Sequence, residues 1–399
     1  MRESIQHIAA IVAVFLSSAI SLHAQTVPVE RKVSAATRLD WEFAARAVGS
    51  APGKLPADYD STKQKYQLFI PKGYTKDKAW PMVLFTSPAD VPNGWKNWQK
   101  FCEQEGVFFA SPYSAGNAKP AGVRTRTILD VLDDVRRQYQ IDPDQTYITG
   151  FSGGGRMACA IGFSLPEYFG GVIPLCGTNT IPAPTYLRHR VEDRLSVAFV
   201  TGEKDSNRKE NEEVMYPWFQ EIGVRSKLWV VPNMGHSIPP PSIVSEVQAW
   251  VAEDLKRRRD DVKARPKLAV AASDTPNGAD QAKRCLESAL GDLKEPRRTW
   301  RGVAMLQGVT QRWGSTASAN EARKVLKGVV NNDKLLQLIE VQGAEDEVKS
   351  ISAQAKAMER FGNVPKAIEA WDILAQNYAG TPIAAKANEN LKRLRAKGK

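Results

Sequence analysis

The stretch that decides the fold is residues 147–159, YITGFSGGGRMAC. A run rich in β-forming residues, 145–149, leads into it, and a helix-compatible run, 156–163, follows. The pattern G-x-S-x-G between a strand and a helix is typical of a sharp turn that presents a nucleophilic serine at the carboxyl edge of a sheet. The sequence therefore predicts Ser152 as a catalytic nucleophile, and a plain glycine-rich turn is the alternative.

The glycines around Ser152 fit this interpretation. Gly150 and Gly154 lack Cβ atoms, so a strand and a helix can approach each other closely there. The strained backbone of such a turn holds the serine side chain outward. The backbone N–H of Gly153, at the start of the helix, would then help to bind an oxyanion.

Apolar runs suited to buried strands alternate with helix-like segments on both sides of this turn. Alternation at this spacing predicts an α/β fold with a mostly parallel sheet and flanking helices. Strands are expected at residues 66–70, 81–86, 107–110, 145–149, 171–176, 195–200 and 227–231, and helices at residues 36–48, 95–104, 126–138, 156–163, 211–222 and 243–258.

The first 24 residues are expected to be a secretory signal peptide. Arg2 opens a short charged region, residues 8–20 are almost wholly apolar, and Ala24 offers a small residue for cleavage. The apolar run is short for a membrane span, and an uncleaved anchor is the alternative. The mature chain is therefore expected to be exported, to the periplasm or the extracellular space, without a transmembrane span.

A serine hydroxyl needs a base to take its proton, and histidine is the usual one. Beyond the expected signal peptide the chain keeps His189 and His236. His189 lies in a charged stretch and is expected to be solvated. His236 follows the apolar run at 227–231, which would bring it to the same sheet edge as Ser152.

The order serine, acid, histidine recurs along the chains of one large class of serine hydrolases. Asp205 follows the apolar run at 195–200, on a turn, and precedes His236. It is the expected acid that orients the imidazole and stabilises its charged form. Glu203 is the rival acid.

A second donor to the oxyanion is expected from the loop after the run at 81–86. The backbone N–H groups of Ala89 and Asp90 are the candidates, because Pro88 has no N–H.

Cysteine and histidine are scarce in this chain. The four cysteines are too few for a disulfide scaffold, and Cys159 and Cys176 are expected to be small buried residues. No metal-ligand spacing occurs among them, so neither a metal nor another cofactor is expected.

The length of 399 residues predicts two domains. The α/β domain is expected at residues 25–260, including an N-terminal extension at 25–60, and an interdomain linker at 261–280. A helical domain is expected at residues 281–399. From residue 263 onward 24 Lys and Arg face 15 Asp and Glu, which accounts for most of the net charge of +11. A basic surface can meet anionic polymers, but a solvated helix surface is the simpler interpretation, and no nucleic-acid partner is expected.

The helical part contains an internal repeat. VTQRWGSTASANEARKVLK at residues 309–327 matches LAQNYAGTPIAAKANENLK at residues 374–392. An aromatic residue, a small turn and spaced alanines describe two closely packed helices, and the segment resembles degenerate tetratricopeptide repeats. It would then bind a protein partner, and an unrelated small helical bundle is the alternative.

Residues 66–255 resemble an α/β-hydrolase of the esterase and polyhydroxybutyrate-depolymerase-like group, which includes feruloyl-esterase-like enzymes. The pieces that carry the resemblance are YQLFIPKGY, WPMVLF, IDPDQTYITGFSGGGRM, PEYFGGVIPLCG, TGEKD and MGH. The resemblance implies hydrolysis of an ester, including one carried on a polymer, through an acyl-enzyme on Ser152 with Asp205 and His236 in support.

One departure from that group keeps other hypotheses open. Many of its members carry His-Gly where this chain has Ser87-Pro88. The oxyanion loop is therefore altered, and a catalytically impaired binding protein that acts through its helical repeats is an alternative. A serine peptidase on the same fold is another, because the three expected catalytic residues do not separate peptidases from esterases.

Overall fold

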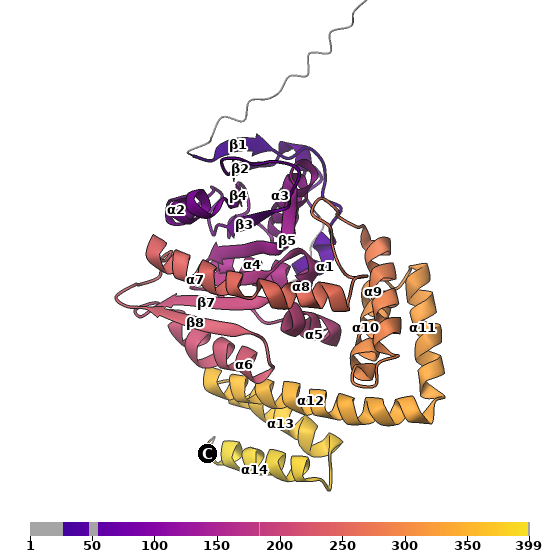
Figure 1. Ribbon diagram of the computed structural model, residues 1–399. Helices are drawn as coiled ribbons and strands as arrows, with labels where there is room; N and C mark the ends of the chain where they lie inside the picture. The colour runs from indigo at the N-terminus through magenta and orange to yellow at the C-terminus, as the bar shows by residue number, and fades with distance from the viewer. Residues whose placement is uncertain (1–26, 48–54, 183, 398–399) are drawn as a thin grey trace, which may run out of the picture.

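The protein is built around a twisted sheet with helices on both faces and a helical region at its C-terminal end (Figure 1). The computed structural model describes residues 27–47, 55–182 and 184–397, so the expected signal peptide lies outside the described residues. The predicted fold class is confirmed. None of the helices within the described ranges has the length and hydropathy that a membrane span requires.

The described strands form one sheet in the order β1-β2-β4-β3-β5-β6-β7-β8. β2 pairs antiparallel with both β1 and β4, and every other pair is parallel, so β2 alone runs against the rest. The strands are β1 (Val29–Lys32), β2 (Lys65–Phe69), β3 (Trp80–Thr86), β4 (Phe108–Pro112), β5 (Ile141–Phe151), β6 (Gly171–Leu175), β7 (Ser196–Gly202) and β8 (Ser226–Val231). The polar edge strand β1 was not predicted, because it has no apolar pattern.

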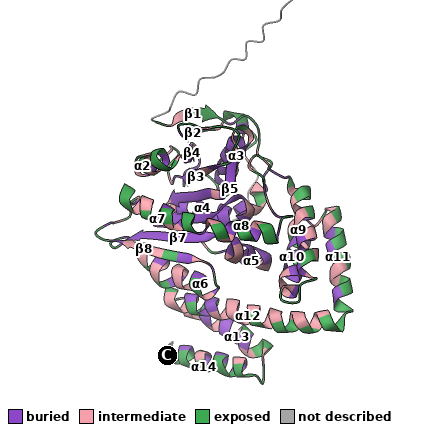
Figure 2. Cartoon of the chain, viewed as in Figure 1, coloured by how far each residue is buried: buried purple, intermediate pink, exposed green. Residues whose placement is uncertain are grey.

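Helices cover both faces of the sheet and enclose two apolar clusters. The helices of the α/β part are α1 (Trp41–Arg46), η1 (Ser61–Lys63), α2 (Trp95–Glu105), α3 (Ala121–Gln138), α4 (Gly153–Ser164), η2 (Pro166–Tyr168), α5 (Thr185–Arg194), η3 (Glu210–Met215), α6 (Tyr216–Glu221), α7 (Pro241–Glu253) and α8 (Leu255–Ala264). Residues of α2 and α7 pack on one face, and residues of α3, α4 and α5 pack on the other. The central strands are buried on both sides (Figure 2), which explains their continuous apolar runs.

The N-terminal helix is shorter than predicted. It was expected at residues 36–48, but α1 begins at Trp41. Side chains of α3 explain the difference, because Asp130 accepts the backbone N–H of Thr37 at 2.7 Å and Asp133 accepts that of Arg38 at 2.8 Å. Buried carboxylates therefore bind the backbone donors of Thr37 and Arg38 and hold this segment against α3, where it is irregular.

The C-terminal helices are α9 (Gly278–Asp292), α10 (Thr299–Arg312), α11 (Ala317–Val330), α12 (Asp333–Phe361), α13 (Val364–Asn377) and α14 (Pro382–Lys397). The segment that joins them to α8 is packed: Leu268 and Val270 are buried, and Arg136 donates to the carbonyls of Ala271 and Asp274 at 2.6 and 2.7 Å. Apolar residues of α9, α10 and α11 share a cluster with those of α3, α4 and α5. The sequence boundaries of the domains remain a prediction.

His189 is buried, so the expectation that it is solvated was wrong. Its side chain is 6% exposed, and its Nε2 lies 3.1 Å from a carboxylate oxygen of Asp346 on α12. Arg188 donates two hydrogen bonds to the same carboxylate, and Trp300 Nε1 donates a third at 3.0 Å. The charged residues that suggested solvation are thus half of an interface between α5 and the C-terminal helices.

The repeat in the sequence corresponds to two similar helix–turn–helix corners. Trp313 closes α10 and Tyr378 closes α13. Three residues later, Thr316 and Thr381 donate their hydroxyls to the carbonyls of those aromatic residues, at 2.8 and 2.7 Å. Between the corners lies the single long helix α12, and the assignment to the tetratricopeptide class stays a prediction.

Candidate active site

The turn between β5 and α4 places Ser152 in a conformation that few residues adopt. Its φ is +54° and its ψ is −120°, a strained backbone held by its surroundings. A Cβ on Gly154 would lie 2.1 Å from the carbonyl oxygen of Thr86, and one on Gly150 would lie 2.0 Å from Thr86 Oγ1. Positions 150 and 154 therefore require glycine, because the end of β3 packs directly against the turn.

Three side chains predicted from the sequence come together at the carboxyl ends of the strands. His236 Nε2 lies 2.9 Å from Ser152 Oγ, and His236 Nδ1 lies 2.8 Å from Asp205 Oδ1. Ser152 follows β5, Asp205 follows β7 and His236 follows β8. Parallel strands end at one edge of a sheet, which brings together residues that are 84 and 31 positions apart.

The carboxylate of Asp205 is fully buried and well supplied with donors. Thr201 Oγ1 donates to Oδ2 at 2.7 Å, and the backbone N–H of Asn207 donates to Oδ1 at 3.0 Å. Burial opposes ionisation, yet the bonds from Asn207, Cys176, His236 and Thr201 hold the pKa of Asp205 below its ordinary value. The carboxylate is therefore charged where it meets the imidazole.

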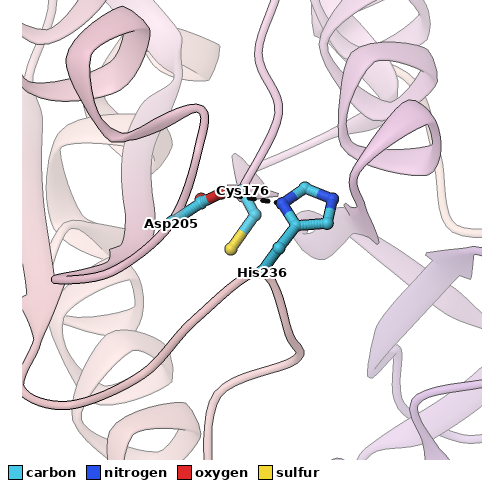
Figure 3. Close-up of side chains that lie close together, drawn as sticks. All are labelled: Cys176, Asp205 and His236. Carbon is cyan, nitrogen blue, oxygen red and sulfur yellow. Dashed lines mark hydrogen bonds and ion pairs between the residues drawn. The ribbon is translucent and has the colours of Figure 1, made fainter.

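Cys176 lies beside Asp205 and His236 (Figure 3). Its Sγ is 3.4 Å from the carbonyl oxygen of Ser237, and burial together with the Asp205 carboxylate raises the pKa of the thiol to about 12. A metal ion could use ligand atoms of these three residues, which lie within 4.8 Å of one another. The thiol is held protonated, however, and the other two atoms already share a hydrogen bond, so the arrangement suits support of the imidazole better than metal binding.

The rival acid points elsewhere. Glu203 Oε2 accepts the backbone N–H of Asn233 at 2.8 Å, and it thereby braces the loop that leads to His236. The imidazole itself also contacts Phe151, with ring centroids 4.8 Å apart. His236 keeps 36% of its side chain exposed, so the serine–histidine pair lies open at the surface.

The oxyanion loop is more constrained than the sequence suggests. The N–H of Ala89 donates to Ser87 Oγ at 3.1 Å, and Asp90 N would lie 2.7 Å from a Cβ on Gly116. Of the three predicted donors, Gly153 N–H is the one placed at the start of α4 beside Ser152.

Sequence reasoning missed several residues that shape this site. Thr201 and Asn207 hold Asp205, Arg124 donates to the carbonyl of Gly153 at 3.1 Å, and Asn117 lies against Gly153. The spacing Asp-x-Asn at 205–207 is typical of a side chain that accepts the N–H two residues on, and it was a usable signal for Asn207. The other three carry no local pattern.

Known proteins are similar to this chain over only part of its length. No family model matches the chain. A poly(3-hydroxybutyrate) depolymerase from Ralstonia pickettii is 32% identical over 103 residues, which cover 22% of this chain and 20% of the depolymerase. A probable feruloyl esterase C from Aspergillus terreus (strain NIH 2624 / FGSC A1156) is 28% identical over 171 residues, which cover 37% of this chain and 63% of that protein. This chain thus spans less than two thirds of either relative.

Two solved structures are also similar. A ferulic acid esterase has 16% identity and a TM-score of 0.40, covering 48% of this chain and 92% of that one. A thermostable esterase has 21% identity and a TM-score of 0.37, covering 48% of this chain and 58% of that one. The fold of this protein is identified by its own strand order and by the turn at Ser152.

Proposed function

We propose that this protein is a serine hydrolase that cleaves carboxylic esters. The observation that carries the proposal is the continuous chain of hydrogen bonds from Ser152 Oγ through His236 to Asp205, at 2.9 and 2.8 Å. It is the arrangement that makes a serine hydroxyl nucleophilic in hydrolases of several folds. The names of the two curated relatives, a depolymerase and a feruloyl esterase, agree with ester hydrolysis.

The reaction follows from the positions of the three side chains. Ser152 Oγ attacks the carbonyl carbon of the ester while His236 Nε2 takes the hydroxyl proton, and Asp205 stabilises the imidazolium. The tetrahedral intermediate collapses, the imidazolium gives its proton to the leaving alcohol, and an acyl-enzyme remains. Water then attacks the acyl carbon with His236 again as base, and the acid is released with Ser152 restored.

The open position of the serine–histidine pair supports a bulky substrate. A histidine with 36% of its side chain exposed can meet an ester that belongs to a polymer or a large molecule as well as a small one. We propose an ester on a polymer as the natural substrate class, in keeping with the depolymerase similarity. Export of the mature chain, as expected from residues 1–24, would bring the enzyme to such a substrate, and the helical repeats at 281–399 would bind a protein partner.

The test is activity-based labelling followed by a substrate panel. A fluorophosphonate is expected to label the wild type, and Ser152→Ala should abolish both labelling and hydrolysis of nitrophenyl esters. Cleavage of peptide anilides in preference to esters would instead indicate a peptidase. Absence of labelling and of hydrolysis in a folded wild type would refute the enzyme hypothesis and leave the binding protein.

A further inference from the structure

The space beside Gly153 is occupied by the side chain of another residue. A Cβ built on Gly153 would lie 2.1 Å from Asn117 Oδ1 and 2.7 Å from Asn117 Nδ2. Distances this short exclude any side chain at position 153 unless the carboxamide moves. Position 153 therefore favours glycine, because the carboxamide of Asn117 packs against the backbone of this residue, directly after Ser152.

The loop that carries Asn117 is firmly held. Asn117 N–H donates to the carbonyl of Pro88 at 2.7 Å, and Gly116 N–H donates to Asp90 Oδ1 at 2.9 Å. Buried Arg124 joins this loop to the nucleophile turn, because it donates to the carbonyls of Ala115 and Gly153 at 2.9 and 3.1 Å. Hydrogen bonds thus join the loop after β4, the oxyanion loop and the turn at Ser152 to one another.

Two positions of the oxyanion loop offer no free backbone N–H in this chain, which leaves that of Asp90. Pro88 has no N–H, and the N–H of Ala89 is already bonded to Ser87 Oγ. The carboxamide of Asn117, in contrast, makes no hydrogen bond to any of the residues that the structure describes. Asn117 is an exposed residue, and both Oδ1 and Nδ2 of its carboxamide lie beside Gly153, so the Nδ2 amide is available to donate.

We infer that Asn117 is an oxyanion-hole residue, whose side-chain amide donates to the ester carbonyl oxygen together with Gly153 N–H. The inference rests on the proposed ester hydrolysis and adds a catalytic group to it. As Ser152 attacks, negative charge develops on that oxygen, and an amide donor carried on this loop stabilises it more in the tetrahedral state than in the ground state. Asn117 thereby compensates for the altered Ser87-Pro88 loop.

The first experiment compares kcat and KM for a nitrophenyl ester in Asn117→Ala and Asn117→Asp. Loss of one oxyanion donor is expected to lower kcat about 10²-fold to 10³-fold with little change in KM. Asn117→Asp keeps the shape but removes the N–H donors and adds a repelling charge, so its loss should be at least as large. Lys119→Ala is the matched control, since that exposed side chain is on the same loop and only pairs with Asp90 at 3.7 Å.

A double-mutant cycle with Gly153→Ala provides a readout that a merely structural role would not give. The new methyl group must displace the carboxamide, so Gly153→Ala should lower kcat in the wild type but have little further effect in Asn117→Ala. The rate of fluorophosphonate labelling should fall in parallel with kcat, because the phosphonyl oxygen occupies the same hole. Thermal unfolding of each variant identifies losses caused by misfolding.

The outcomes separate the inference from the proposed function. If Asn117→Ala and Asn117→Asp keep wild-type kcat while Ser152→Ala is inactive, the enzyme proposal stands and the role of Asn117 is wrong. Additive effects of the Asn117 and Gly153 changes would also overturn it. If the folded wild type hydrolyses no ester, both proposals fall together.

Discussion

Arg188 of α5 and Asp346 of α12 form a two-bond ion pair, with Nη1–Oδ1 at 2.8 Å and Nη2–Oδ2 at 2.5 Å. The two residues are 158 positions apart, and their side chains are 9% and 14% exposed. Burial opposes ionisation of Asp346, yet the donors from His189 and Arg188 hold the pKa of its carboxyl well below the ordinary range. This carboxylate therefore ties the α/β part to the C-terminal helices.

Asp346→Asn should destabilise the protein by about 3 kcal/mol, because it leaves a largely buried guanidinium without its counter-charge. The contribution of the pair is present above the unfolded carboxyl pKa of about 3.9 and is lost as the pH falls below it. Urea unfolding of the full chain at pH 7 measures the effect, and Glu345→Gln, an exposed neighbour on α12, is the control. Equal losses in the two variants would show that the ion pair is not responsible.

His189 should make the stability of the protein depend on pH. Burial lowers its pKa, against an opposing effect of Asp346, and the charges of Arg301 and Arg188 lower it further. The unfolded chain therefore binds a proton near pH 6.5 that the folded chain does not bind, so stability should fall as the pH drops below about 6.5. His189→Gln should flatten the slope of unfolding free energy between pH 7 and 5, and parallel slopes would contradict this assignment.

Asp205→Asn should lower kcat by about 10⁴-fold, because the amide can no longer fix the tautomer of His236 or stabilise its charged form. Glu203→Gln is the matched control on the same loop, since Glu203 bonds Asn233 N–H rather than the imidazole. It should retain most of the wild-type kcat. Steady-state kinetics with a nitrophenyl ester decide the matter, and a larger loss in Glu203→Gln would reverse the assignment of the acid.

Gly154→Ala should destabilise the protein by about 1–3 kcal/mol and displace Ser152, because the added methyl group meets the backbone of Thr86 at 2.1 Å. The control is Gly328→Ala in α11, where a Cβ has nothing within 4 Å. That change should stabilise the helix by about 0.5–1 kcal/mol. Thermal unfolding and fluorophosphonate labelling report the two consequences separately, and a fully stable, reactive Gly154→Ala variant would show that β3 yields there.

The fold could be predicted because its signals are local. Buried parallel strands read as apolar runs, and the turn at Ser152 combines a strand, glycines and a helix within a few residues. The candidate site followed from chain order, since Asp205 and His236 each come directly after a strand. Their hydrogen-bonded geometry is seen in the structure, and their catalytic roles remain to be tested by the variants above.

What the sequence did not indicate depends on contacts between distant segments. His189 looked solvated because its neighbours are charged, yet two of those neighbours, Arg188 and Asp193, pair with residues more than a hundred positions away. Residues 36–40 looked helical, but the segment is irregular and carboxylates of α3 accept the backbone N–H groups of Thr37 and Arg38. Asn117 belongs to no sequence motif. Its relevance appears only in the structure, where its carboxamide occupies the space that a side chain at position 153 would need.

The placement of the long helix α12 has a practical consequence. In Figure 1 the loop from β8 to α7, which carries His236, projects on the left, whereas α9, α10 and α11 lie on the right and α12 runs below the sheet. The helices α9, α10 and α11 are therefore distant from the loop that carries His236, whereas α12 packs against η3 and α6. If a protein partner binds to α9, α10 and α11, as proposed for the helical repeats, the loop that carries His236 stays uncovered, and partner binding would not compete with the proposed hydrolysis.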